Sequence, residues 1–311
     1  MSRVVIIGAG QFGQNHIRIV RESPEAHLAA IIDPNPARAL PNIPHYRTLA
    51  DLPPNTADAA IIAAPTACHA ALGVQAMSLG LDVLIEKPIA PTLPEADQLI
   101  ASATQHNRIL QVGHLERYNS AVIALEAAAT LPLFFEIHRM SVFSPRSLDT
   151  DVVLDLMIHD LDIVLALTRS PIEAIQAAGV QILSPKTDIA NVRLQFQDGC
   201  IANLTASRVS TEKIRKLRLF QPHQYLSLDY ARQDLAAFTV GPDQQIGFQQ
   251  HATEKTEPLK LQFAAFLQSI RTRQTPKLSG QIARRTLALA LDITAKIEEH
   301  AALVTRTLQA R

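Results

Sequence analysis

The chain has 311 residues, 47% of them hydrophobic and 19% charged, a composition that suits roughly two folded domains and excludes bulk disorder. Its 29 basic and 29 acidic residues cancel, so the overall charge gives no support to a nucleic-acid-binding protein. Two cysteines exclude a disulfide framework, and no apolar run reaches the roughly 18 residues of a membrane-spanning helix. We therefore expect a cytoplasmic protein with neither a nucleic-acid nor a membrane partner.

Short apolar runs alternate with helix-compatible segments through the first third of the chain. Continuous β-branched runs are typical of strands buried on both faces of a parallel sheet. Strands alternating with helices indicate βαβ units, so we predict a parallel α/β domain over residues 1–116. The predicted strands are 3–8, 28–32, 58–64, 82–85 and 109–112, and the predicted helices are 14–21, 68–79 and 94–104.

The pattern changes after residue 117, where strands follow one another through turns. Asp198-Gly199 between two apolar segments is typical of a hairpin. We predict an α+β domain with a largely antiparallel, open sheet over residues 117–311. Its predicted strands are 134–140, 191–196, 201–204, 217–220 and 225–228, and its predicted helices are 152–168, 261–271 and 281–300.

The segment Gly8-Ala9-Gly10-Gln11-Phe12-Gly13 has the pattern G-x-G-x-x-G directly after the first predicted strand. In a dinucleotide-binding loop, the first glycine allows the tight turn and the second lets a pyrophosphate approach the backbone. The third glycine lets the following helix pack against the strand, and the helix N-terminus attracts the phosphates. The alternative is that these glycines only form a turn.

Asp33 follows Gly13 by 20 residues and ends the second predicted strand. A carboxylate there accepts hydrogen bonds from the adenosine ribose and repels a 2′-phosphate, which favours NAD over NADP. Arg38 lies close enough in the sequence to leave accommodation of a 2′-phosphate open.

Two further segments follow strand ends that should face the same crevice. Pro65 ends the third strand, and His69 starts the next helix, where a plain surface residue is the alternative. Glu86 and Lys87 end the fourth strand, and Pro88 biases Lys87 to an extended backbone. A lysine there can hydrogen-bond a reacting hydroxyl and stabilise a developing oxyanion. The alternative is a solvated surface ion pair.

Asp155 and His159 are four residues apart in a helical segment and share one face. An aspartate beside a histidine can orient the imidazole for use as a general base. Both residue types also bind zinc, but the segment offers no second positioned histidine and no cysteine, so we predict no metal site. A surface pair on the helix is the other alternative.

These motifs together resemble the glucose–fructose oxidoreductase/inositol dehydrogenase (Gfo/Idh/MocA) family in order and spacing over the whole chain. Glu86-Lys87-Pro88 is the most specific element. Within the family, the chain resembles a nucleotide-sugar subgroup that includes the UDP-N-acetylglucosamine 3-dehydrogenases. The segments that carry this narrower resemblance are 113–119, 145–146, 153–162, 213–217 and 228–235.

The family resemblance implies an NAD-dependent enzyme that oxidises a sugar hydroxyl to a ketone. It implies that Lys87 positions the hydroxyl, His159 takes its proton and Asp155 orients the site. The subgroup implies C3 of UDP-N-acetylglucosamine as the reacting position, with the product passing to an aminotransferase toward 3-amino sugars for lipid A. The implied cofactor-binding residues are Gly8, Gly10, Gln11, Phe12, Gly13, Asp33, Pro65, His69 and Glu86. The implied substrate-binding residues are Lys87, Arg117, Tyr118, Asn119, Arg146 and His159.

A substrate diphosphate needs cations, and residues 208–218 carry five cations against one glutamate. This segment is either a diphosphate-binding patch or a charged strand edge exposed to solvent. Tyr118 and Tyr230 are candidates to stack on uracil or to lie in the core.

Other functions stay open at this stage: a dehydrogenase of a free sugar or inositol, a non-enzymatic NAD-binding regulator, and a structural protein that keeps the fold. The resemblance and the open second sheet also imply a homo-oligomer, either a dimer or a tetramer.

Overall fold

The computed structural model describes residues 1–143 and 150–309. The chain forms two compact units: unit 1 consists of Met1–Leu115 and Glu257–Leu287, and unit 2 of Glu116–Thr256 and Ala288–Arg311. The predicted domain boundary, after residue 116, lies one residue beyond the point between Leu115 and Glu116 where the chain first passes from unit 1 to unit 2. The sequence prediction gave the whole of 117–311 to the second domain, whereas Glu257–Leu287 belongs to unit 1.

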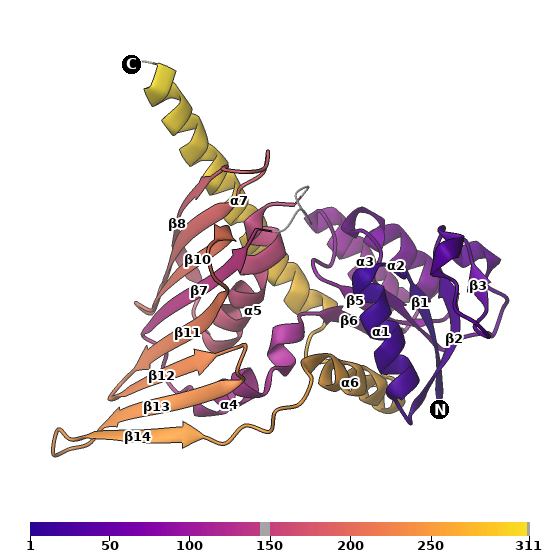
Figure 1. Cartoon of the computed structure of the whole chain (residues 1–311), viewed down its shortest axis with the longest axis horizontal. Helices are drawn as coiled ribbons and strands as arrows, with labels where there is room; N and C mark the ends of the chain where they lie inside the picture. The colour runs from indigo at the N-terminus through magenta and orange to yellow at the C-terminus, as the bar shows by residue number, and fades with distance from the viewer. Residues whose placement is uncertain (144–149, 310–311) are drawn as a thin grey trace. The chain divides into compact units, whose positions relative to one another are not determined.

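Unit 1 contains a parallel six-stranded sheet in the order β3-β2-β1-β4-β5-β6 (Figure 1). This is the strand order of a Rossmann fold, and the order reverses between β1 and β4, where a dinucleotide crevice forms. The strands are β1 (Ser2–Ile7), β2 (Ala26–Ile32), β3 (His45–Tyr46), β4 (Ala59–Ile62), β5 (Asp82–Glu86) and β6 (Leu110–Gly113). The α-helices are α1 (Gln11–Glu22), α2 (His69–Ser78), α3 (Leu93–Gln105), α6 (Pro258–Thr272) and the beginning of α7 (Gly280–Gln309).

Helix α6 completes the hydrophobic core of unit 1. Pro258 occupies its first turn, where a missing backbone N–H costs no helical hydrogen bond. Leu259, Phe263, Phe266 and Leu267 are buried in one cluster with side chains of α1, β1 and β2. The parallel sheet therefore depends on a segment that lies more than 140 residues beyond the last of its strands.

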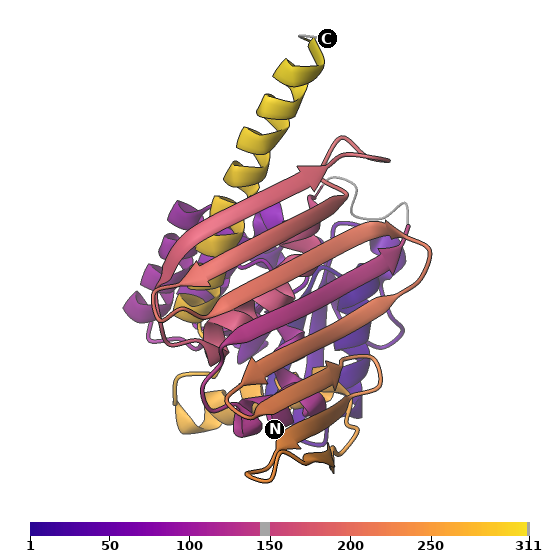
Figure 2. The same ribbon diagram turned by 90° about the vertical axis from the view of Figure 1, so that its left-hand side faces the viewer.

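Unit 2 contains an eight-stranded sheet in the order β14-β13-β12-β11-β7-β10-β9-β8 (Figure 2). Neighbouring strands are antiparallel except for the parallel pair β7 and β10. The strands are β7 (Phe134–Val142), β8 (Ile172–Val180), β9 (Ile189–Phe196), β10 (Ile201–Ser210), β11 (Ile214–Gln221), β12 (Gln224–Asp229), β13 (Asp234–Val240) and β14 (Ile246–His251). The predicted fold class is confirmed in both units.

Helices of unit 2 cover one face of this sheet, and among the described residues no helix of this unit covers the other, which we call bare (Figures 1 and 2). The covering helices are α4 (Ser120–Ala128), α5 (Ile158–Leu167) and the C-terminal part of α7. Alternation along β11 follows from this layering, because Leu217 and Leu219 are buried whereas Lys216 and Arg218 are exposed. We call the helix-covered side the inner face and the bare side the outer face.

The sequence prediction omits four elements of unit 2. Strand β8 has a weak alternation, and β14 is almost wholly exposed, so neither gives a clear hydrophobic period. Strand β13 and the short helix α4 were omitted as well. The Asp198-Gly199 hairpin is confirmed, with Gly199 at φ +88° between β9 and β10.

Among the described residues, no helix is both long and apolar enough to cross a lipid bilayer.

Candidate active site

The glycine loop of unit 1 joins β1 to α1. Gly8 has φ +89°, a left-handed conformation that favours glycine, and a Cβ there would lie 2.7 Å from the backbone nitrogen of Ala64. At Gly13, a Cβ would lie 2.0 Å from the carbonyl oxygen of Gly8. These two glycines are therefore required by the close packing of strand, loop and helix.

Gly10 differs from both, because nothing lies within 4 Å of where its Cβ would be. It is the N-cap of α1 and gives the helix no side-chain cap, and the first turn carries no acidic residue. The N-terminal N–H groups and the positive end of the helix dipole thus face an open position. Gly10 fits a loop over which a pyrophosphate passes closely. Gln11 and Phe12 follow it in the first turn of α1, and the Phe12 ring is exposed.

We expect Gly10→Ala to leave the fold intact while weakening NAD binding about tenfold or more, because the added methyl group occupies only ligand space. Calorimetric titration with NAD measures the affinity, and urea unfolding measures stability. Gly247→Ala is the matched control, since the nearest atom to its Cβ is 3.7 Å away on a strand of unit 2. Unchanged NAD affinity in Gly10→Ala would contradict the assignment of the loop.

Asp33 lies directly after β2 and is anchored to the glycine loop. Its Oδ2 accepts a hydrogen bond from the backbone N–H of Ala9 at 2.7 Å, and its Oδ1 accepts one from Asn35 at 2.9 Å. These two bonds fix the carboxylate beside the loop, and each oxygen keeps a second lone pair. The geometry suits hydrogen bonds from two ribose hydroxyls.

Replacing Asp33 by alanine removes the negative charge that would repel a 2′-phosphate. We expect the ratio of kcat/KM with NADP to kcat/KM with NAD to rise about tenfold or more. In Asp33→Ala the Ala9 amide also loses its hydrogen-bond acceptor, and this lowers kcat/KM with NAD for a second reason. Asp33→Asn removes the charge but keeps an oxygen that can accept this bond, so it isolates the effect of the charge. A cofactor ratio that stays constant in both variants would show that another residue contacts the ribose.

Glu86 ends β5 and is held in a buried pair that no sequence motif predicts. His16 of α1 contacts the Glu86 carboxylate, with 2.8 Å between Nε2 and Oε1, and both residues are buried. The other carboxylate oxygen lies 3.4 Å from the Lys87 backbone nitrogen. A Cβ at Gly113 would lie 2.8 Å from the carboxylate, so only glycine fits beside it. The pair joins the glycine-loop helix to the lysine segment.

His69 holds the other side of the same segment. Its side chain is 1% exposed, with Nδ1 2.9 Å from the Pro88 carbonyl oxygen and Nε2 3.0 Å from the Ala64 carbonyl oxygen. The expectation of direct cofactor contact stays a prediction, and the surface alternative for His69 is wrong. His69 ties the end of β4, next to Pro65, to the segment that carries the half-buried Lys87.

Burial lowers the pKa of His69 below its ordinary value, outweighing the Ala64 and Pro88 carbonyls and the Glu86 charge, which raise it. The unfolded chain therefore binds the proton more readily, and stability is lost as the pH falls below the ordinary histidine range. We expect wild-type protein to lose more stability than His69→Gln between pH 7.5 and 5.5. Urea unfolding at both pH values measures this, and equal losses would contradict it.

In unit 2, Asp155 and His159 lie on consecutive helical segments. Asp155 lies in the π-helical turn η5 (Val153–Met157), and His159 is the second residue of α5. The backbone amides of Val153 and Leu154 donate to the Asp151 carboxylate, which caps the turn. The prediction of a helix over 152–168 is confirmed apart from this wide turn, a local form that often occurs at functional sites.

A buried ionic network lies beneath this helix. Arg139 of β7 donates two hydrogen bonds to Asp160, at 2.7 and 2.8 Å, and one to Glu116 at 2.9 Å. The Tyr230 hydroxyl donates to Asp160 at 3.0 Å, and the Arg139 guanidinium lies 4.8 Å from the Tyr230 ring centroid. Tyr230 is thus a core residue, and the network fixes the strand β7 to the residue that follows His159.

Two of the predicted substrate-binding residues have side-chain hydrogen-bond partners within unit 2, whereas the buried hydroxyl of a third, Tyr118, has none among the described residues. Arg117 is buried and bonds to Glu126 and Asp162. Asn119 is the N-cap of α4, and its Oδ1 accepts from the Ala121 amide. Burial raises the pKa of Tyr118 to about 12. Their contact with substrate stays a prediction, and Arg146 lies outside the described residues.

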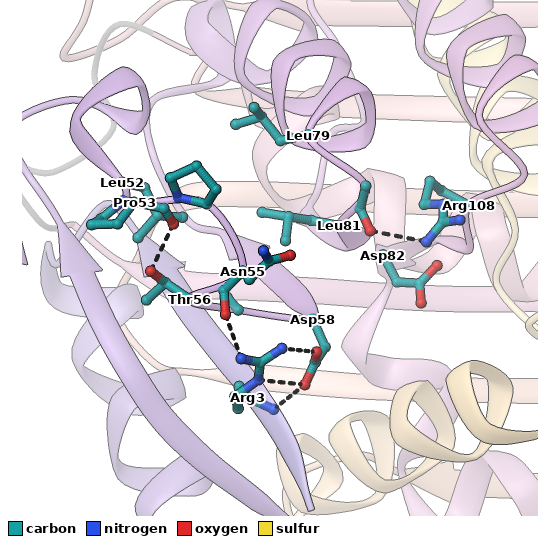
Figure 3. A pocket seen from close by; sticks show the side chains of 13 residues that line it. Arg3, Leu52, Pro53, Asn55, Thr56, Asp58, Leu79, Leu81, Asp82 and Arg108 are labelled. Carbon is teal, nitrogen blue, oxygen red and sulfur yellow. Dashed lines mark hydrogen bonds and ion pairs between the residues drawn. The ribbon is translucent and has the colours of Figure 1, made fainter.

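Unit 1 also contains a pocket of about 430 Å³ at the N-terminal ends of its strands, whereas the glycine loop and Lys87 follow the C-terminal ends (Figure 3). It lies where β1, β4 and β5 begin, whereas ligands of such sheets bind where strands end. Its polar groups bond to one another, as Arg3 does to Asp58 at 2.6 Å and Arg108 to the Gly80 carbonyl at 2.9 Å. The pocket is therefore separate from the motifs above. No cluster of three or more metal-binding side chains occurs in the described part of the chain.

The chain is similar to known oxidoreductases over nearly its whole length. It is 34% identical to the UDP-N-acetylglucosamine 3-dehydrogenase of Acidithiobacillus ferrooxidans over 306 residues, 95% of this chain and 97% of the relative. A solved structure of that enzyme superposes with a TM-score of 0.90, at 32% identity, covering 96% of this chain and 98% of the other. The inositol 2-dehydrogenase of Corynebacterium glutamicum (strain R) is 28% identical over 60% of this chain and 58% of its own length.

Family models agree with both units. The model described as the oxidoreductase family with an NAD-binding Rossmann fold matches residues 2–114, and that of the GFO/IDH/MocA C-terminal domain matches residues 128–220. Together with the anchored Asp33 and the open helix terminus at Gly10, these matches identify a sugar dehydrogenase that uses NAD. The chain belongs to the Gfo/Idh/MocA family of oxidoreductases.

Proposed function

We propose that the protein oxidises C3 of UDP-N-acetylglucosamine to a ketone. The observation that carries this proposal is the 34% identity, over 95% of the chain, to a UDP-N-acetylglucosamine 3-dehydrogenase. The product would be a 3-keto nucleotide sugar. Its carbonyl is the group that an aminotransferase consumes, so we propose such an enzyme as the next step toward 3-amino sugars of the lipid A type.

Oxidation of the alcohol removes a proton from oxygen and a hydride from carbon. When bound, NAD accepts the hydride. We assign the proton to His159, whose imidazole acts as general base, and we assign orientation of the site to Asp155. Lys87 donates a hydrogen bond to the hydroxyl oxygen and stabilises the negative charge that develops on it. The contacts of Glu86 and His69 fix the backbone on either side of Lys87.

The direct test is NADH absorbance with protein near stoichiometric to NAD. Near-stoichiometric protein makes a single turnover visible even where oxidation to the ketone is uphill. Substrates are UDP-N-acetylglucosamine, other UDP-sugars, free sugars and inositols. We expect a signal with UDP-N-acetylglucosamine, with mass and NMR placing the ketone at C3. Adding an aminotransferase specific for 3-keto nucleotide sugars, with its amino donor, should pull the reaction forward.

Oxidation of inositol is the second candidate, because several relatives with 26–29% identity are inositol 2-dehydrogenases. A signal only with inositols or free sugars would favour it over the nucleotide sugar. Bound NAD without turnover of any of these substrates would favour a regulator.

We also propose that the outer face of the sheet in unit 2 is covered by a second copy of the chain. Five aromatic residues stand directly opposite one another on adjacent strands of that face, and neighbouring rings lie 4.8–5.8 Å apart. An aromatic row of this kind suits the centre of a symmetric interface. The row consists of Phe134, Phe220, Tyr225, Phe238 and Phe248.

Light scattering tests this second proposal. We expect wild-type protein to form a dimer or tetramer and the double variant Phe220→Glu/Phe248→Glu to be smaller. A monomeric wild-type protein would overturn the proposal.

A further inference from the structure

One cation of residues 208–218, Arg215, lies on the inner face of the sheet in unit 2, and a second, Lys213, lies close to it. Residues of one strand alternate between its faces, and Leu217 and Leu219 of β11 are buried on the inner face. Arg215, two residues before Leu217, therefore faces inward. Lys213 lies one residue before the strand and is exposed, and the charges of Arg215, Glu116 and Arg139 act on it. Lys216 and Arg218 alternate with the inward-facing residues of β11 and are exposed on the outer face.

On the inner face, the positive charge of Arg215 lies beside that of another arginine. Arg215 is directly opposite Arg139 on the neighbouring strand β7, an arrangement that is unfavourable without anions. Glu116 compensates in part, since Arg139 donates to its Oε1 at 2.9 Å and the Arg215 Nη1 lies 3.8 Å from the same oxygen. One carboxylate oxygen thus serves two arginines.

Arg215 is also incompletely satisfied. Its Nε is buried, and among the described residues no acceptor lies within hydrogen-bond distance of it. A buried donor without an acceptor is costly and calls for a physical explanation. Burial and then repulsion from Arg139 lower the pKa of Arg215. Repulsion from Arg215 and then partial burial lower the pKa of Lys213, so the two side chains are electrostatic neighbours. A bound anion would raise both pKa values again.

The other described cations of the segment have different surroundings. Arg208 is buried, donates to the Thr150 carbonyl and lies 3.7 Å from Asp188. Lys216 and Arg218 face away from the helices. By contrast, Arg215 lies near Asp155, whose charge acts on it, and so on the side of the sheet that carries the π-helical turn and His159.

We propose that Lys213 and Arg215 bind the diphosphate of the nucleotide sugar. The proposal rests on the proposed function for its substrate and deepens it by naming the residues that select a phosphorylated sugar over a free one. The Arg215 guanidinium suits planar, bidentate contact with phosphate oxygens, and Lys213 adds a second positive charge. The ligand would supply the acceptor that the Arg215 Nε lacks and a negative charge for Lys213. A free sugar or an inositol offers no such group.

The experiment compares two double variants that remove the same charge. Lys213→Gln/Arg215→Gln, the inner-face variant, removes the charge of Arg215 on the inner face together with that of its neighbour Lys213, and Lys216→Gln/Arg218→Gln is the matched control on the outer face. Calorimetry with UDP and with inorganic pyrophosphate measures binding, in the presence of saturating NAD so that the dinucleotide site does not compete. We expect the inner-face variant to bind UDP roughly 10- to 100-fold more weakly and the control to bind it as wild-type protein does.

Steady-state kinetics and a charge-retaining variant separate binding from folding. In the inner-face variant, KM for UDP-N-acetylglucosamine should rise by a similar factor while kcat changes little. Lys213→Arg/Arg215→Lys keeps both charges but moves the guanidinium, so it should recover part of the UDP affinity. Light scattering and urea unfolding check that all variants keep their assembly and fold. The diphosphate site would be overturned if both double variants bound UDP as wild-type protein does. It would also be overturned if both lost UDP affinity to the same extent.

The outcomes also separate this inference from the proposed function. Wild-type protein that binds UDP through Lys213 and Arg215 but does not oxidise UDP-N-acetylglucosamine would support the anion site and overturn the proposed substrate. Turnover of UDP-N-acetylglucosamine with unchanged KM in the inner-face variant would support the function and overturn the site.

Discussion

Replacing Lys87 by methionine should lower kcat about 10²- to 10⁴-fold while NAD affinity changes less than about twofold. Methionine keeps most of the length and apolar volume of the side chain and removes only the ammonium group. The main-chain contacts of the segment, from Glu86 to the Lys87 nitrogen and from His69 to the Pro88 oxygen, do not involve that group. The loss should therefore appear in the chemical step. Stopped-flow NADH formation measures it, and calorimetry measures NAD binding.

The matched control for this variant is Lys186→Met, which removes an exposed lysine from a loop of unit 2. Lys87→Arg adds a second comparison, because it keeps the charge but changes the geometry of the donor. Turnover near the wild-type rate in Lys87→Met would exclude the proposed role in stabilising the oxyanion.

Replacing His159 by asparagine should lower kcat by about 10²- to 10⁴-fold and flatten its pH dependence. A protonated imidazole cannot accept a proton, so wild-type turnover should fall toward acidic pH, and the variant should lose this fall. His159 is the second residue of α5, just after the π-helical turn, and the next residue, Asp160, is fixed by Arg139. Loss of the imidazole should therefore leave the helix in place. The measurement is the pH profile of single-turnover NADH formation.

His223→Asn is a suitable control, because His223 is an exposed turn residue with φ +59°, a conformation that asparagine adopts readily. Asp155→Asn tests orientation of the site separately: it should lower kcat less than His159→Asn and keep the pH dependence. A variant of His159 that retains the acidic fall of the wild-type profile would assign the base to another residue.

Local patterns predicted much of the fold. Apolar β-branched runs marked β1, β2, β4 and β5, because these signals lie within the strands that they specify. Strand β14 could not be found in this way, since its exposed residues carry no buried period. The sequence of α6 shows only an amphipathic helix. Its place in unit 1 is determined by packing against α1, β1 and β2, which lie far away in the sequence.

The candidate site was predictable to the same extent. The glycine loop, Lys87 and His159 stand in motifs, but the groups that hold them are set by contacts between distant segments. His16 and Glu86 are 70 residues apart, and the Arg139–Asp160 pair joins a strand to a helix 21 residues later. The choice among the cations of 208–218 needed the register of β11 against β7, which a single strand cannot reveal.

The passage of the chain through both units has a consequence for its synthesis. The six strands of the NAD-binding sheet are all made by residue 113, yet four of the side chains in its core come from α6, which begins at Pro258. On the ribosome, the nascent sheet must wait with part of its apolar surface uncovered while all of β7–β14 emerges. We therefore expect a nascent chain arrested after residue 116 to bind chaperones and to lack NAD binding, which it should gain only when residues up to Leu287 have left the exit tunnel.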